Sequence, residues 1–327
     1  MQIDPLATRR VDSVSFVGES LKRPECVLCT RAGHWYSADW RGGVAHCDPG
    51  GKLSLYSATL GERPLRPNGL ALLPDGSFLL ADLGEQMGGV FKLWRDGAVR
   101  PFLEQVDGID LPPTNFVMLD RLNRIWITVS TRLQPRSLGY NAHCADGFIV
   151  LVDNTGARIV ADGLGYTNEC IVSQDGRHLW VNETFGRRLS RFDIAADGSL
   201  SNQQTLAHFA HGLYPDGLAQ DINGDFWVTS IVSNRVAHVD RDGIVTVWLD
   251  DSDSSHVSEA ELAYQSGKLG RQHLDSIKSR RLKNISSLAF GGPRLTTGHL
   301  GCLLGDQIAL VEMPVAGVAP AHWHFDD

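Results

Sequence analysis

Five short apolar segments along the chain share one layout. Each begins with Pro or Thr, continues with an acid or an amide, and then runs on through apolar residues. Short apolar runs of this kind, bounded by turn residues, are typical of buried β-strands. The segments span residues 24–28, 67–71, 114–118, 167–171 and 215–219.

A second apolar segment follows each of these, and a turn separates the two. The turns contain Gly in four of the five cases, which favours tight reversals. An aromatic residue then occurs ten to twelve positions after the acid or amide. These aromatic residues are Trp35, Phe78, Trp126, Trp180 and Trp227. The repeat therefore predicts pairs of antiparallel strands.

The spacing of the repeat predicts its architecture. The acids and amides at positions 25, 68, 115, 168 and 216 are 43, 47, 53 and 48 residues apart, and a sixth unit places Ser287 in the same column. A four-stranded propeller blade takes about 40–50 residues. We therefore predict an all-β chain, with residues 1–327 forming a single six-bladed β-propeller domain of four-stranded antiparallel blades.

Two segments lie outside the regular repeat. Residues 250–284 precede the last blade and form a predicted surface insertion, with a short helix over 258–264; it is either a flap over one mouth of the propeller or a solvated excursion. Residues 11–17 alternate partly like a strand, and we expect them to pair with the last blade and close the ring.

The repeat column predicts a functional site. Because the blades are related by rotation, the residues at the start of the innermost strands lie at the same mouth of the central channel. Two carboxylates and several amides in such a ring would repel and lose hydration unless a cation lay between them. Oxygen donors favour Ca²⁺, with Mg²⁺, Mn²⁺ and Zn²⁺ as alternatives. The column contains Glu25, Asn68, Asn115, Asn168, Asp216 and Ser287.

Three of these segments resemble the metal-ligand segments of the SMP-30/gluconolactonase family. They are Pro-Glu at Glu25, Thr-Asn-Glu at Asn168 and Pro-Asp-Gly-Leu-Ala at Asp216, and residues 286–292 are similar to the family's final blade. The similarity extends over about residues 25–314. It implies a metal-dependent lactone hydrolase in which Glu25, Asn168 and Asp216 bind the metal. Asn115 would contact the substrate or the metal and its water.

One segment departs from the family pattern. Sugar-lactone members carry Arg-x-Asn-Asp around the further asparagine, whereas this chain has Pro113, Thr114, Asn115 and Phe116. The resemblance then implies a less hydroxylated or partly aromatic substrate, with Asn115 and Phe116 as substrate contacts. Asn68, in a Pro-Asn-Gly sequence, is interpreted as a turn residue.

Composition narrows the classes of function. The net charge is −8, which disfavours a polyanionic nucleic acid as partner. No stretch approaches the roughly 20 apolar residues that span a bilayer, and the first residues lack the features of a secretory signal. Six cysteines in 327 residues are too sparse for a disulfide framework. The expectation is a cytoplasmic protein with a small-molecule partner; its oligomeric state stays open.

The hypothesis from the sequence is hydrolysis of a lactone by metal-activated water, with Asp216 or Glu25 as the base. Glu169 and Glu183 are secondary candidates near the mouth. Two alternatives stay open. One is a metal-dependent aryl esterase or organophosphate hydrolase, and the other is a non-catalytic ligand-binding propeller with a structural ion.

Overall fold

The computed structural model describes residues 8–57, 59–61 and 63–326, which form six four-stranded antiparallel sheets. The innermost strands are β2 (Val27–Cys29), β8 (Pro67–Leu72), β14 (Thr114–Leu119), β18 (Thr167–Val172), β22 (Tyr214–Gln220) and β26 (Ile285–Gly291). The second strands are β3 (Trp35–Asp39), β9 (Phe78–Asp82), β15 (Ile125–Val129), β19 (His178–Glu183), β23 (Phe226–Ile231) and β27 (Thr297–Cys302). The third strands are β4 (Gly43–Cys47), β10 (Gly89–Leu93), β16 (Gly147–Asp153), β20 (Arg188–Ile194), β24 (Arg235–Val239) and β28 (Ile308–Glu312).

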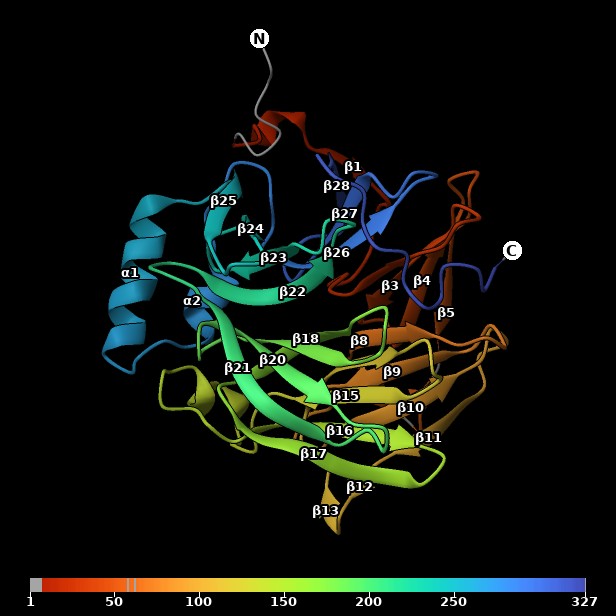
Figure 1. Cartoon of the computed structure of the whole chain (residues 1–327). Coiled ribbons are helices and arrows are strands. Elements are labelled where there is room, and N and C mark those ends of the chain that lie inside the picture. The colour runs from red at the N-terminus through yellow and green to blue at the C-terminus, as the bar shows by residue number, and fades with distance from the viewer. Residues whose placement is uncertain (1–7, 58, 62, 327) are drawn as a thin grey trace.

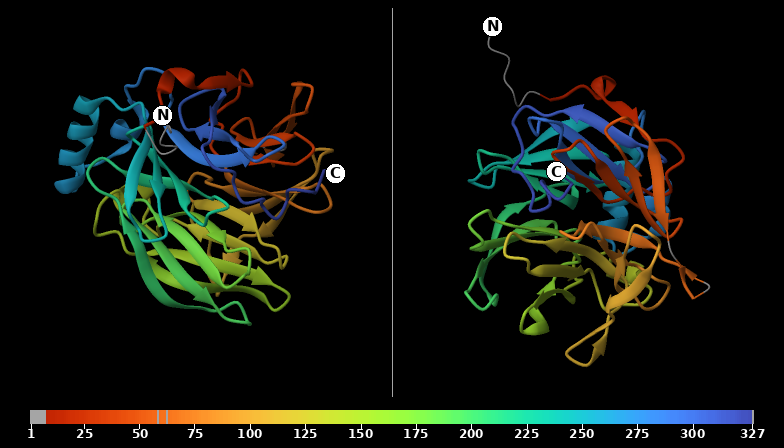
Figure 2. Two further views of the ribbon diagram at one scale, coloured as in Figure 1. Left: turned by 45° about the horizontal axis from the view of Figure 1, so that its top comes forward. Right: turned by 90° about the vertical axis from the view of Figure 1, so that its right-hand side faces the viewer.

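The outermost strands complete the sheets, and two short hairpins lie outside them. The outermost strands are β5 (Leu53–Ser57), β11 (Val99–Leu103), β17 (Gly156–Leu164), β21 (Leu200–His208), β25 (Val245–Asp250) and β1 (Ser15–Val17). The hairpins are β6 (Thr59–Leu60) with β7 (Arg63–Pro64), and β12 (Gln105–Val106) with β13 (Ile109–Asp110). Each innermost strand contacts the innermost strands of both neighbouring sheets, so the sheets close into a ring. The right-hand view of Figure 2 is approximately along the axis of this ring. The predicted six-bladed β-propeller is confirmed.

The N-terminal strand closes the ring. Strand β1 pairs antiparallel with β28, from Ser15 opposite Leu310 to Val17 opposite Ile308. The last sheet therefore combines both ends of the chain, which removes an exposed edge. The prediction of a strand over residues 11–17 is wrong in its first half, because Val11–Ser13 form a 3₁₀ turn (η1). Burial of Val11 against the last two blades, rather than strand pairing, holds this turn.

Two of the five aromatic residues of the repeat, Trp126 and Trp227, are hydrogen-bonded to the turns of their own blades. Trp126 and Trp227 are fully buried. Asp120 accepts backbone N–H groups of its turn through Oδ1 and the Trp126 indole N–H through Oδ2 (2.9 Å). Asp221 does the same for Trp227 (3.0 Å). In these two blades one carboxylate thus satisfies both the turn and the buried indole, and in both the tryptophan follows the aspartate by six residues.

The segment between β25 and β26 forms two helices, α1 (Ser254–Gln265) and α2 (Arg271–Asp275). Helix α1 is longer than predicted, since Asp253 caps it by accepting the His256 N–H. It is not a solvated excursion. Glu261 on α1 is buried and forms a bidentate ion pair with Arg187 (3.0 and 2.5 Å), and Tyr264 lies against the same guanidinium group.

The C-terminal segment after β28 crosses the opposite end of the ring from these helices (Figure 1). Sequence reasoning did not anticipate this strap. Its hydrogen bonds reach three blades: Val318 N–H to the Gln220 carbonyl (2.9 Å), Arg121 Nη2 to the Ala319 carbonyl (2.7 Å) and Arg31 N–H to the Trp323 carbonyl (2.8 Å).

The remaining expectations concern cysteines and membrane spans. All six cysteines lie among the described residues, and each is a buried free thiol. Within the same described part of the chain, no helix is long and apolar enough to cross a bilayer.

Candidate functional site

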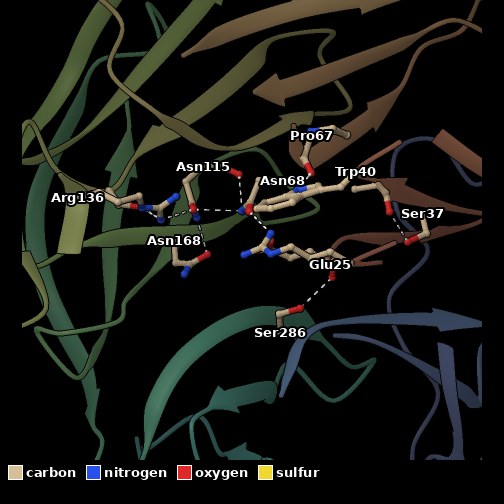
Figure 3. Close-up of polar contacts among 12 residues, drawn as sticks. Glu25, Ser37, Trp40, Pro67, Asn68, Asn115, Arg136, Asn168 and Ser286 are labelled. Carbon is tan, nitrogen blue, oxygen red and sulfur yellow. Dashed lines mark hydrogen bonds and ion pairs between the residues drawn. The ribbon is translucent and has the colours of Figure 1, made fainter. Parts of the chain in front are cut away.

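The predicted column residues meet at one mouth of the central channel. Glu25, Asn68, Asn115, Asn168 and Asp216 are each at most 7% exposed, and we refer to these five residues as the polar mouth. Figure 3 shows Asn115 between Arg136 and Asn68, with Asn168 below Asn115 and Glu25 below Asn68. Asn68 Nδ2 donates to Asn115 Oδ1 (3.1 Å), and Asn115 Nδ2 donates to Asn168 Oδ1 (2.7 Å). The interpretation of Asn68 as a turn residue is wrong, because it lies in β8 and continues this network.

Three carboxyl groups lie buried at or directly beneath the polar mouth. Burial raises the pKa of Asp216 well above its ordinary value, and the charge of Glu25 raises it further; Arg23, Arg136 and the Asn168 amide oppose the shift. Burial likewise raises the pKa of Glu169, with a hydrogen bond from the Leu218 N–H opposing and the charges of Asp216 and Glu25 adding to it. The site concentrates negative charge away from water, which is costly unless a cation balances it.

Arg23 supplies part of that balance. Its Nη1 pairs with Glu25 Oε2 and also donates to Asn68 Oδ1 (2.9 Å). The guanidinium group lies 4.4 Å from the centre of the Trp40 ring, and Trp40 in turn donates to the Pro67 carbonyl (3.1 Å). Arg23 has a positive φ of 51°, a conformation that the sequence pattern does not signal. Sequence reasoning therefore missed this residue.

Arg136 enters the mouth from a loop between β15 and β16. Asp146 joins the two ends of this loop, accepting from Thr131 Oγ1 (2.7 Å) and the Arg132 N–H (2.9 Å). Arg136 starts the 3₁₀ turn η2 (Arg136–Gly139), and its Nη2 donates to Asn115 Oδ1 (3.0 Å).

The Arg136 side chain is also held from its other edge. Its Nε donates to the Tyr166 hydroxyl (2.7 Å), and the guanidinium group lies 5.4 Å from the centre of that ring. Among the described residues it has no ion-pair partner within 4 Å, and its Nη1 makes none of the hydrogen bonds found there. The sequence lacks the family's arginine two residues before Asn115, but the fold brings a different arginine to Asn115.

The other predicted residues have different surroundings. Phe116 packs against apolar clusters from blades 1 to 4, approaches the backbone of Gly69, and lines a cavity on the channel axis outside the polar mouth. It remains a predicted substrate contact. Glu183 is fully buried and bonded to Arg188, Ser190 and the Gly165 N–H, so its oxygens serve the structure of blade 4. Ser287 is buried, and its hydroxyl has no hydrogen-bond partner among the described residues.

The donor set suits a hard divalent cation. Glu25 and Asp216 carry carboxylate oxygens, and Asn168 and Asn115 carry amide oxygens. In this structure the two amide oxygens accept hydrogen bonds from neighbouring side chains, which a bound cation would have to displace or share. No histidine belongs to the polar mouth, and nitrogen-preferring metals usually require one. Burial raises the pKa of Asp216 and the charge of Glu25 raises it further, and a bound dication would relieve this repulsion between the two carboxylates.

Known proteins share the sequence family and the fold of this chain. Residues 62–250 match the family described as SMP-30/Gluconolactonase/LRE-like region. A gluconolactonase from Xanthomonas campestris is 18% identical over 96% of this chain and 94% of its own, with a TM-score of 0.68. A calcium-binding protein, regucalcin, from Agrobacterium tumefaciens is 14% identical over 95% of this chain and 97% of its own, with a TM-score of 0.63. The virginiamycin B lyase of Staphylococcus aureus, in complex with quinupristin, is 13% identical over 88% of this chain and 80% of its own, with a TM-score of 0.55. At these identities the structural likeness shows the fold alone.

Proposed function

The chain belongs to the SMP-30/gluconolactonase/LRE-like family, and on that premise we propose that it is a divalent-metal-dependent hydrolase that opens a lactone ring. The observation that carries the proposal is the burial of Glu25, Asn168 and Asp216 around one end of the channel, although they lie far apart along the chain. Water exclusion strengthens electrostatic interactions at such a site.

Glu25, Asn168, Asp216 and Asn115 would hold the metal. Calcium is the favoured ion because the donors are oxygens, and because a structurally similar protein is described as calcium-binding. When bound, a divalent cation supplies a Lewis acid that polarises an ester carbonyl. The remaining chemistry belongs to the side chains of the mouth.

Asp216 is the better candidate for the base. One oxygen of Glu25 is engaged by Arg23, whereas the Asp216 carboxylate has Asn168 as its neutral neighbour. Asp216 would accept the proton of the attacking water at a carboxylate oxygen, and the protonated acid would return it to the departing alkoxide. The water O–H bond and the ester C–O bond break, and a new C–O bond to the acyl carbon and an O–H bond on the alkoxide form. Asp216 begins and ends the cycle as a carboxylate.

Arg136 would position the substrate. Its Nε and Nη2 are held by Tyr166 and Asn115, while Nη1 keeps its donor capacity for an incoming oxygen. A guanidinium group binds carbonyl, hydroxyl and carboxylate oxygens. The substrate therefore needs an oxygen substituent within reach of Arg136, which modifies the expectation of a less hydroxylated lactone that the sequence suggested.

A second candidate is a ligand-binding propeller without catalysis. The Arg23–Glu25 ion pair favours it, because a group of the chain itself neutralises one of the predicted metal ligands. Under this alternative the polar mouth would bind a ligand without turning it over.

The two candidates differ in turnover. We would assay the purified protein against γ- and δ-lactones, aryl esters and phosphotriesters, with Ca²⁺, Mg²⁺, Mn²⁺ or Zn²⁺ and with excess chelator. Lactone hydrolysis that chelator abolishes and one metal restores supports the proposal. Hydrolysis of phosphotriesters alone would assign a different substrate class. Saturable lactone binding without hydrolysis under any metal would favour the second candidate.

A further inference from the structure

A separate cavity of about 230 Å³ lies on the axis of the ring, between the polar mouth and the C-terminal strap. All six innermost strands contribute to its wall, together with residues 318–322 of the strap. None of the five residues of the polar mouth lines it. We call this space the axial cavity.

The middle of the axial cavity is apolar, and polar residues line both of its ends. Those at the end toward the strap are Asp120, Arg121, Ser173, Gln174, Asp175, Gln220 and His322. Leu70, Leu218, Leu288 and Phe290 are among the apolar lining residues. The polar exceptions on the innermost strands near the mouth are Glu169 and Ser287. Glu169 immediately follows Asn168, and Ser287 stands in the repeat column, so both lie at the end of the cavity that faces the mouth.

Both polar groups have unused hydrogen-bonding capacity. The Ser287 hydroxyl is 2% exposed and has no partner among the described residues. The Glu169 carboxyl accepts one backbone N–H, from Leu218 (2.9 Å), at Oε2. A buried hydroxyl without a partner forfeits its hydrogen bond to water. An apolar pocket with a few convergent polar groups is the usual form of a small-molecule site.

We propose that the axial cavity binds an uncharged amphiphile, with its apolar body along the channel and a hydroxyl group between Ser287 and Glu169. A hydroxyl both donates and accepts, so it satisfies the serine and the carboxyl group together. An anionic headgroup would find no cationic lining residue at this end of the cavity, because Arg121 and His322 lie toward the strap. The volume exceeds the ~150 Å³ that holds benzene in an engineered cavity, so a body of about eight to ten carbon atoms is appropriate. The inference is independent of lactone hydrolysis.

The test compares probes that share one chain and differ in headgroup. Isothermal titration calorimetry with 1-octanol, octanoate and octylamine should give saturable binding for 1-octanol, and at least tenfold weaker binding for the other two. Octylamine or octanoate binding as tightly as the alcohol would overturn the proposal. So would the absence of saturable binding of 1-octanol to a folded protein.

Two serine variants sharpen the test. Ser287→Ala removes the hydroxyl at the cavity, and we expect affinity for 1-octanol to fall about three- to tenfold. Ser286→Ala is the matched control, because Ser286 donates to the Glu25 carbonyl (3.1 Å) and does not line the cavity. Its affinity for 1-octanol should be unchanged. Equal affinities of the two variants would contradict the placement of the headgroup.

A third variant blocks the cavity. Ala289 lines the wall, and Ala289→Phe should abolish 1-octanol binding while the melting transition stays cooperative. Undiminished binding in a folded Ala289→Phe protein would locate the ligand elsewhere and overturn the assignment.

Discussion

At one end of the channel, buried carboxyl groups and amides lie at or just before the first residues of the innermost strands, and two guanidinium groups lie beside them. A few residues later the same strands carry leucine, alanine and phenylalanine. The two halves of the channel share one scaffold and one rotational repeat. They differ because the first half buries a cluster of carboxyl, amide and guanidinium groups, whereas the second half is mostly apolar and carries Glu169 and Ser287 where it meets the first. Blade formation requires the apolar half, because the strands must pack against each other. It does not require the polar half, where burial of Glu25 and Asp216 costs free energy, so we assign function there first.

Removal of the proposed base should have the largest effect. Asp216→Asn retains the size of the side chain but removes a proton acceptor and a metal ligand, so we expect lactone turnover to fall at least ~100-fold. Initial rates at saturating metal are the measurement. Asp242→Asn, at an exposed turn in blade 5, is the matched control and should retain wild-type turnover. Wild-type activity in the Asp216→Asn protein would remove the polar mouth from the chemistry.

Removal of the metal should come next, and it acts on stability as well as activity. A ligand that binds only the folded state at 100 times its Kd stabilises by about 2.7 kcal/mol. We expect the Tm to fall by several degrees in excess chelator and to recover with Ca²⁺. The same treatment of Asp216→Asn should change the Tm little. A chelator-induced shift of equal size in both proteins would place the stabilising ion outside the mouth.

Arg136→Gln should have an intermediate effect on catalysis. Loss of one positioning donor is expected to raise KM about tenfold. Arg136 lowers the pKa of Asp216, so its removal raises that pKa. Because the base must be ionised, the acidic limb of the kcat/KM profile should move to higher pH. Arg177→Gln, on the exposed surface, is the control. An acidic limb that stays in place would separate Arg136 from Asp216.

The pH dependence of the metal-free protein gives a smaller effect. Burial raises the folded pKa values of Asp216 and Glu169 above their ordinary values of 3.8 and 4.5. The folded state therefore holds these protons more tightly, and the resulting stability is present below those values and is lost as pH rises through the raised pKa values. With chelator present, the Tm should decline as pH increases from about 4 to 8.

Glu169→Gln should reduce this decline, because it removes one of the two groups. Glu312→Gln, at an exposed position of blade 6, should leave it unchanged. A Tm that rises with pH in the chelated wild-type protein would contradict buried, unbalanced carboxyl groups in this half of the channel.

The repeat could be predicted because each blade carries the same short sequence pattern. A strand, a turn and an aromatic residue recur in each blade, and Asp120 with Trp126 shows how one short segment holds its own turn. The column of acids and amides follows from the same rotation. For this reason the positions of Glu25, Asn168 and Asp216 around the channel could be predicted from the sequence alone.

The residues that balance the charge were not predictable in this way. Arg23 depends on a positive φ, and Arg136 depends on a loop whose path is fixed by Asp146. The buried pairing of Glu261 with Arg187 joins residues 74 positions apart, and no repeat relates them. Contacts between non-repeating segments are set by tertiary packing, and the sequence pattern contains no period that reports them.

The central claim is that Glu25, Asn168 and Asp216 together hold one divalent cation. Equilibrium dialysis against Ca²⁺, followed by elemental analysis of the retained protein, tests it directly. We predict one Ca²⁺ per chain for the wild-type protein and a loss of most of it in Asp216→Asn and Glu25→Gln, each still folded. Retention of the ion in both variants, or no bound ion in the wild-type protein with any of Ca²⁺, Mg²⁺, Mn²⁺ and Zn²⁺, would contradict the claim.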